Sequence, residues 1–332
     1  MGPIELIVAS GALEAAPFGL VDVGASGGID PRWRAFGDSL SALAFDPSIT
    51  GCERLNQGEA NLPGDVRYFA QVVGGRTPPR PREAFNSYPF DRLHATAVLR
   101  EQSLALDDYF NELKPTKFVE DYQILRPSGK APTPPDLSQR LRPRNAERPA
   151  APATLDAILR EQNFDADFIK IDTDGADFAV LCGAETALAH CPVMAVLIEA
   201  NFAGDLSPAA NTFTNIDIFL RTHGFSLFDL SGPWRYSRQD LPAPFLHPFP
   251  SQSVTGQVLW SDALYLRDLA MPPYHDLFDL KIDVAKVCKL VAIAYSFDLP
   301  DFAVELVNRY RIAIGERLDA ARLVEALSAP KS

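Results

Sequence analysis

The sequence has few cysteines, and their spacing excludes the common cysteine-based sites. Only four occur in 332 residues, at positions 52, 182, 191 and 288. No pair has the C-x-x-C spacing, so the cysteines give no zinc pattern, and four in a chain of this length do not form a disulfide framework. We expect reduced, mostly buried thiols in a cytoplasmic protein.

The sequence also lacks long apolar runs. No run approaches the roughly 18 residues that a membrane-spanning helix needs, so we expect no membrane span. The first ten residues, M-G-P-I-E-L-I-V-A-S, have no positive charge ahead of the apolar stretch and contain Glu5 within it. This pattern is not typical of a secretory signal peptide.

Positive charge is scarce as well. Lys and Arg number 31 against 43 Asp and Glu, which gives a formal net charge of −12. Proteins that bind nucleic acids usually concentrate positive charge, so we expect no nucleic-acid partner. The hydrophobic fraction of 47% and the length are those of a globular protein with a full buried core.

Short apolar segments alternate with segments of helical periodicity. Strands are predicted at residues 18–23, 40–45, 66–73, 168–171 and 193–198. Helical patterns follow the first of these strands, at residues 31–37, and lie between the last two, at residues 177–189. This alternation predicts an α/β fold with a doubly wound, mostly parallel sheet.

Three stretches depart from this alternation. Residues 127–152 hold seven prolines and five Lys or Arg without hydrophobic periodicity, and we interpret about 90–150 as a Pro-rich insertion. Residues 241–250 (L-P-A-P-F-L-H-P-F-P) are an aromatic, Pro-rich loop. Residues 271–332 predict three amphipathic helices, a C-terminal appendage to a domain at 1–270. They pack either on that domain or on a partner chain, and the second case predicts a homo-oligomer through these helices.

Acidic residues stand where several predicted strands end. Asp22, Asp46, Asp172 and Glu199 each lie at the carboxyl end of a different strand. Turns favour Asp in any case, so each alone is weak evidence. Ligands of open α/β sheets bind beyond the carboxyl ends of the strands, so the four together predict a binding site at this edge.

The stretch L-V-D-V-G-A-S-G-G-I, residues 20–29, leads from a buried strand into a loop with almost no side chains. Its spacing does not fit the dinucleotide pattern G-x-G-x-x-G, and Asp22 would repel a pyrophosphate. A ligand with a cationic amino group suits this carboxylate, and S-adenosylmethionine has one. Asp46 is then placed to accept hydrogen bonds from a ribose diol, unless it only starts a turn before Pro47.

A lysine interrupts the strand D-F-I-K-I-D, residues 167–172. Lys170 shares a strand face with Phe168 and Asp172. A lysine in an apolar strand is costly without a partner, and the candidate partners are Asp22, Asp172 and Glu199. The group either organises the strand ends or positions a methyl donor or a substrate hydroxyl.

Together these motifs carry a family resemblance. The segments V-D-V-G-A-S-G-G-I, A-F-D-P-S, T-L-D-A-I-L, D-F-I-K-I-D-T-D-G-A-D-F-A-V-L-C-G-A and V-L-I-E-A-N resemble successive motifs of FkbM-type S-adenosylmethionine-dependent methyltransferases. The similarity covers roughly residues 18–268 and is interrupted by the insertion. The stretch G-Q-V-L-W-S-D-A-L-Y-L-R-D resembles the last strand of members that modify glycans.

The resemblance implies a class I methyltransferase (Rossmann-like) fold with seven strands, ending in an antiparallel hairpin of residues 225–230 with 263–267. It implies S-adenosylmethionine as cofactor and methyl transfer to a hydroxyl oxygen of a glycan or other sugar-containing acceptor, as in polysaccharide biosynthesis, or of a polyketide. Cofactor binding is carried over to the first strand end, the glycine loop and the second strand end: Asp22, Gly24, Ala25, Ser26, Gly28, Asp46 and Pro47. Candidate catalytic residues are Lys170, Asp172, Asp174 and Glu199.

The sequence departs from the family pattern at two points. Ser26 stands where many class I enzymes have Gly, and Thr173-Asp174 replaces the usual Val-Glu. For the base that accepts the hydroxyl proton we favour Asp172 or Asp174, with Glu199 third.

Three alternatives to these assignments stay open. His190 and His223 are rival bases, better explained as helix C-terminal residues. Asp172, Asp174 and Glu199 could offer oxygen ligands to Mg²⁺, but no regularly spaced cluster of ligands supports a metal site, and we expect no metal. A non-catalytic cofactor-binding or assembly protein remains an alternative function, as does a nicotinamide-dependent oxidoreductase, which the loop spacing disfavours.

Overall fold

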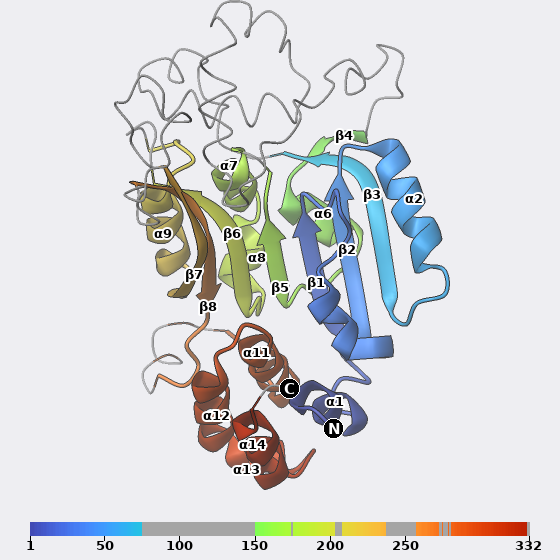
Figure 1. Ribbon diagram of the computed structural model, residues 1–332, viewed down its shortest axis with the longest axis vertical. Coiled ribbons are helices and arrows are strands. Elements are labelled where there is room, and N and C mark those ends of the chain that lie inside the picture. The colour runs from blue at the N-terminus through green and yellow to red at the C-terminus, as the bar shows by residue number, and fades with distance from the viewer. Residues whose placement is uncertain are drawn as a thin grey trace, which may run out of the picture.

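A computed structural model describes residues 1–74, 150–173, 175–202, 208–236, 257–271, 274, 278 and 280–330. Their fold is built on an eight-stranded sheet with the order β4-β3-β2-β1-β5-β6-β8-β7 (Figure 1). The strands are β1 Phe18–Val23, β2 Leu40–Asp46, β3 Asp65–Val73, β4 Ala150–Ala153, β5 Phe168–Ile171, β6 Ala195–Asn201, β7 Ser226–Tyr236 and β8 Gln257–Leu266.

The sheet is mixed α/β and mostly parallel, as expected, but its strand count corrects our prediction of seven. β1 pairs in parallel with β2 on one side and with β5 on the other, so the strand order reverses between them. β8 lies antiparallel between β6 and β7, which confirms the predicted hairpin. The additional strand is β4, which pairs in parallel with β3 at the edge of the sheet.

The central strands are apolar because both of their faces are buried. All six residues of β1 are buried. Phe18 and Leu20 belong to one core cluster, whereas Val21 and Val23 belong to the cluster on the opposite face. This alternation is the period of two of a β-strand, and it puts Asp22 on the same face as Leu20.

Helices cover both faces of the sheet. One cluster contains side chains of α6 Leu155–Glu161, α7 Asp177–Cys182, α8 Glu185–His190 and α9 Phe213–Thr222. The other contains side chains of α1 Pro3–Ala9, the 3₁₀ helix η1 Pro31–Ser39, α2 Ile49–Glu59 and the C-terminal helices.

The helix predicted at residues 177–189 is in fact two, α7 and α8. A Cβ on Gly183, which lies between them, would stand 3.0 Å from the backbone oxygen of Gly74, so the chain comes close to β3 there. The Asp156 carboxylate accepts hydrogen bonds from the amides of Thr186 and Ala187 and so caps α8 from outside that helix.

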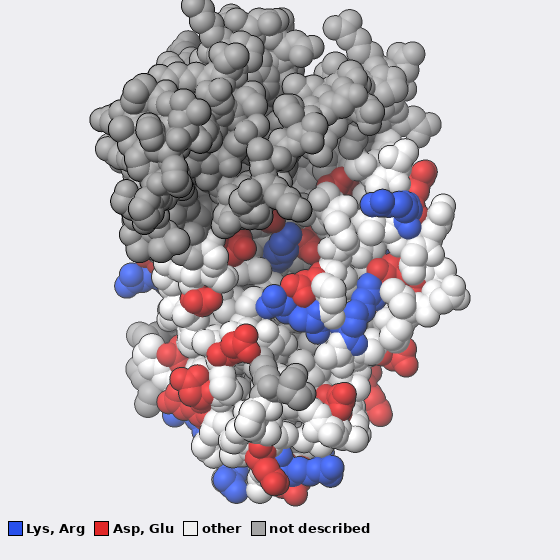
Figure 2. Space-filling view, viewed as in Figure 1, with Lys and Arg blue, Asp and Glu red and all other residues white. Residues whose placement is uncertain are grey.

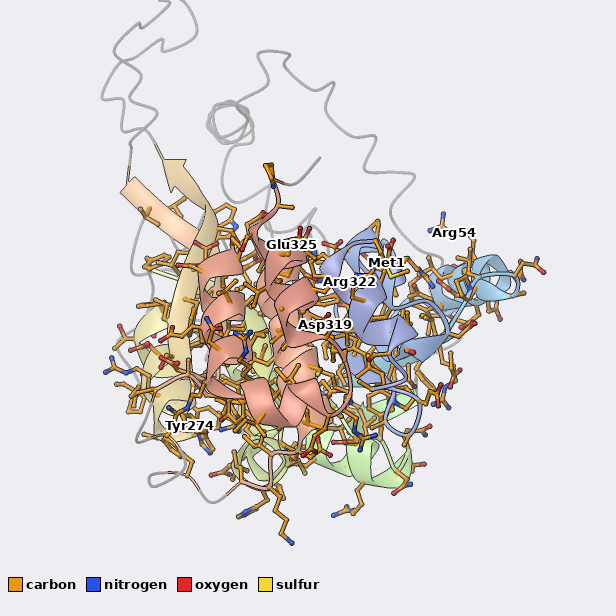
Figure 3. All side chains as sticks on the ribbon, turned by 90° about the horizontal axis from the view of Figure 1, so that it is seen from below. Met1, Arg54, Tyr274, Asp319, Arg322 and Glu325 are labelled. Atoms are coloured by element: carbon orange, nitrogen blue, oxygen red, sulfur yellow. The ribbon has the colours of Figure 1, made fainter. Side chains whose placement is uncertain are left out.

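The C-terminal helices pack on this chain itself. The described residues of this region form α11 Val284–Ser296, α12 Pro300–Arg309, α13 Arg311–Gly315 and α14 Ala320–Ser328, which is four helices rather than the predicted three. α1 lies beside them at the end where the parallel strands begin (Figures 1 and 3). Their apolar side chains share a cluster with β1 and β5. The domain boundary at residue 270 stays a prediction.

A buried charge cluster anchors α11 to the sheet. The fully buried Asp167 carboxylate, just before β5, lies 2.6 Å from Lys286 Nζ and 2.7 Å from Lys289 Nζ. The same carboxylate accepts a hydrogen bond of 2.7 Å from the backbone N–H of Gly19 in β1. One side chain therefore joins two strands to the C-terminal helices.

None of the helices in the described part of the chain has both the length and the apolar character that crossing a membrane requires.

Candidate functional site

The candidate site lies at the carboxyl edge of the sheet, where the strand order reverses. Register places Asp22 of β1 beside Lys170 of β5. Lys170 Nζ lies 3.3 Å from Asp22 Oδ1 and 3.3 Å from Asp172 Oδ2. We call Asp22, Lys170 and Asp172 the sheet-edge triad. Two of the three partners proposed for Lys170 therefore form ion pairs with it.

Burial and neighbouring charges shift the pKa values of Asp22 and Lys170. Asp22 is 2% exposed, and burial raises the pKa of its carboxyl despite the adjacent Lys170. Burial lowers the pKa of Lys170, but the negative charges of Asp22 and Asp172 outweigh this effect, so the net change is an increase. Lys170 is therefore a fixed cation at neutral pH. Figure 2 shows that Lys and Arg residues lie beside Asp and Glu residues on the face of the molecule that is turned to the viewer.

The glycine loop passes close to the triad. Gly24 has φ +93°, and a Cβ there would lie 1.7 Å from the backbone oxygen of Asp172. In return, the N–H of Asp172 donates to the oxygen of Val23. Only glycine permits this approach of the two backbones. The N–H groups of Gly24 and Ala25 both donate to the oxygen of Phe45, which ties the loop to β2.

The middle of the loop is open. Ser26 and Gly27 are exposed, and nothing lies within 4 Å of where a Cβ on Gly27 would stand. Gly28 has φ +90° and packs against Tyr68. At the end of β2, Asp46 Oδ1 accepts a hydrogen bond of 2.7 Å from the N–H of Ser48, which orients the carboxylate, while Pro47 is exposed.

The other acids of the prediction have different outcomes. Glu199 is buried near the end of β6, the strand next to β5. Asp174 lies outside the described residues, as does the predicted aromatic loop at 241–250.

Sequence reasoning missed Asp262, which lies opposite Glu199 in the antiparallel register of β6 and β8. Asp262 is exposed, yet partial burial of its carboxyl by neighbouring groups raises the pKa of that group. The negative charge of Asp172 adds to that increase.

Asp177 was missed as well, and it organises the loop after β5. Its fully buried carboxylate accepts hydrogen bonds from Thr173 N and Oγ1, Gly175 N and Asn211 Nδ2. Burial raises the pKa of Asp177, and the donated hydrogen bonds oppose that change. The presence of threonine at position 173, which departs from the family pattern, therefore has a local structural explanation. Its hydroxyl bonds to Asp177, where a valine has no donor.

The two histidines lie where the sequence predicted, at helix ends. His190 is the last residue of α8, and His223 follows α9, with Nδ1 2.7 Å from the oxygen of Phe219. Among the described residues, no three His, Cys, Asp or Glu side chains are grouped so that they could hold a metal ion.

Part of the chain matches a known family model. No curated protein matches the chain. Residues 84–227 match the family model described as the methyltransferase FkbM domain. The matched range includes the whole of the predicted insertion as well as Lys170, Asp172 and Glu199, and it begins after the glycine loop and Asp46. The resemblance seen in the motifs is thereby confirmed. The match to the FkbM methyltransferase domain supports a methyltransferase function.

Proposed function

We propose that the protein is an S-adenosylmethionine-dependent O-methyltransferase that acts on a hydroxyl of a glycan or another sugar-containing acceptor. The observation that carries the proposal is the sheet-edge triad beside an open glycine loop, at the point where the strand order reverses. Open α/β sheets bind their ligands at this point.

The residues of the site fit the cofactor. Gly27 leaves room for a ligand against the backbone. Within the described part of the chain, no group donates a hydrogen bond to the buried Oδ1 of Asp22, although Lys170 lies at ion-pair distance. In the proposed arrangement, Asp22 and the loop of Gly24, Ala25, Ser26 and Gly28 hold the methionine part. Asp46, with Pro47 beside it, accepts hydrogen bonds from the ribose hydroxyls.

Methyl transfer to an alcohol requires alignment and removal of one proton. When bound, S-adenosylmethionine supplies an electrophilic methyl group. Sugar hydroxyls are weak nucleophiles, so a carboxylate within hydrogen-bond reach accepts the proton as the oxygen attacks. Asp172 is our first choice and Glu199 the next, with Asp174 as a further candidate outside the described residues. Lys170 is not the base, because its raised pKa keeps it protonated. Its role is to hold Asp172 and Asp22 in place.

The test is transfer of a labelled methyl group from S-adenosylmethionine to a panel of methyl glycosides. We expect labelled product, and a loss of about 100-fold or more in rate for Asp172→Asn with cofactor affinity retained. Asp217→Asn is the control, because Asp217 lies on α9 and accepts a hydrogen bond from Tyr265. Full activity in Asp172→Asn would remove Asp172 as the base. Cofactor binding without transfer to any acceptor would favour the non-catalytic alternative.

A cytoplasmic location, a role in polysaccharide biosynthesis and self-association through the C-terminal helices stay predictions.

A further inference from the structure

Tyr68 of β3 supports the glycine loop from two strands away. The sheet order is β3-β2-β1, yet the N–H of Ile29 donates a hydrogen bond of 3.1 Å to the Tyr68 hydroxyl. A Cβ on Gly28 would stand 3.4 Å from the same oxygen. Tyr68 is 5% exposed, so the hydroxyl is buried beneath the end of the loop.

The direction of each hydrogen bond at this hydroxyl is fixed. Because its oxygen accepts from Ile29, its own proton is available for Glu59 Oε1, which lies 3.2 Å away at the end of α2. Burial and the nearby Glu59 raise the pKa of Tyr68 to about 12, so the proton is retained at neutral pH. Glu59 Oε1 also pairs with Arg34 of η1, the helix that follows the loop. This series of contacts runs from the end of the loop at Ile29 through Tyr68 and Glu59 to Arg34, so it connects the loop with the helix that follows it.

Tyr68 itself is held in register. Its N–H donates to Asn56 Oδ1 at 2.9 Å, and its backbone oxygen accepts from Asn56 Nδ2 at 2.8 Å. Asn56 lies on α2, as Glu59 does, so this helix fixes both the backbone of Tyr68 and the partner of its hydroxyl. The hydroxyl is therefore a rigid support for the loop.

We propose that Tyr68 is a positioning residue for the cofactor: through Ile29 it fixes where the backbone of residues 26–28 lies relative to the adenosyl ligand. The inference rests on the proposed function, since it assumes that this loop binds the cofactor. It assigns Tyr68 no contact with the reacting atoms.

The variant Tyr68→Phe removes the hydroxyl and keeps the ring. Calorimetric titration of the full chain with S-adenosylhomocysteine should show about five- to tenfold weaker binding, the effect of one lost hydrogen bond that orders a binding loop. Glu59→Gln keeps an acceptor for the hydroxyl and should lose less affinity than Glu59→Leu.

A matched control exists in Tyr265→Phe. The Tyr265 hydroxyl is likewise bonded to a carboxylate, Asp217 Oδ1 at 3.2 Å, but on the opposite face of the sheet. The affinity of the Tyr265→Phe variant for S-adenosylhomocysteine should stay within about twofold of that of the unaltered protein, even if Tyr265→Phe and Tyr68→Phe lose similar stability. Equal losses of affinity in the two variants, or none in Tyr68→Phe, would overturn the inference.

Hydrogen exchange separates this inference from the proposed function. In the ligand-free chain, Tyr68→Phe should raise amide exchange at Ile29 about tenfold, and Tyr265→Phe should not. If the unaltered chain does not bind S-adenosylhomocysteine, the proposed function fails, while the exchange result still decides whether Tyr68 holds the loop. Unchanged exchange at Ile29 would refute the support role.

Discussion

Replacing Lys170 by Met tests the electrostatics of the sheet-edge triad. Met keeps the length of the side chain and removes the charge that lies 3.3 Å from both Asp22 and Asp172. Removing one partner of a buried ion pair costs about 3–5 kcal/mol. The Lys170 side chain is 26% exposed, and solvent screening reduces that figure. We expect a loss of about 2 kcal/mol in the free energy of unfolding at about pH 8.

The loss should depend on pH with a definite sign. Burial raises the folded-state pKa of Asp22 above its ordinary value of 3.8, so the folded state favours the protonated carboxyl. The contribution of Asp22 to stability is thus fully present below pH 3.8 and is lost as the pH rises through the folded-state pKa. Removing Lys170 raises that pKa further, and each unit corresponds to about 1.4 kcal/mol. The deficit of Lys170→Met should therefore grow as the pH rises from 3.8 through the folded-state pKa of Asp22 towards neutral pH.

Urea unfolding at several pH values measures this deficit. The control compares the double variant Asp22→Asn/Lys170→Met with Asp22→Asn alone. The buried carboxyl is absent from both, so the deficit caused by Lys170→Met should lose most of its pH dependence. A deficit of the same size at both ends of the pH range, or no deficit at the upper end, would refute the reasoning.

Three further predictions concern the glycine loop, the loop after β5 and the opposite edge of the sheet, where β6 begins. Gly24→Ala should lower the free energy of unfolding by about 2 kcal/mol or more, because φ is +93° and its Cβ would meet a backbone oxygen at 1.7 Å. Gly27→Ala, with open space, should stay within about 0.5 kcal/mol in the same urea titration, and a reversed order would contradict the loop geometry. Thr173→Val should cost about 1 kcal/mol through loss of the hydroxyl bond to Asp177, and thermal unfolding that leaves it equal to the unaltered protein would count against this clamp. Arg267→Met should cost about 3 kcal/mol, because the buried guanidinium donates to three backbone carbonyls and to a tyrosine hydroxyl. Calorimetric unfolding with no loss would show that those carbonyls find other donors.

Much of the site could be predicted because parallel strands carry their signal locally. The apolar run of β1 and its terminal Asp22 are adjacent in sequence, and the carboxyl ends of parallel strands meet at one edge. This rule for parallel strands does not find Asp262. Its strand runs antiparallel, so a residue at this edge is found only when the register of β6 and β8 is known.

The remaining features depend on contacts that are distant in sequence. β4 has the sequence A-A-P-A, which gives no strand signal, and the edge position is one that tolerates its Pro152. Lys286 and Lys289 have helical spacing, but their partner Asp167 is more than a hundred residues away. The packing of the C-terminal helices on the sheet therefore could not be derived from their own amphipathic pattern.

The most direct test of the central claim is calorimetric titration of the full chain with S-adenosylmethionine, S-adenosylhomocysteine and NAD, repeated on Asp46→Ala. The account predicts micromolar binding of both adenosyl ligands, no binding of NAD, and a large loss of affinity in the variant, because Asp46 is the proposed acceptor of hydrogen bonds from the ribose hydroxyls. Binding of NAD, or of none of the three, would contradict the proposal that the glycine loop and Asp46 hold S-adenosylmethionine.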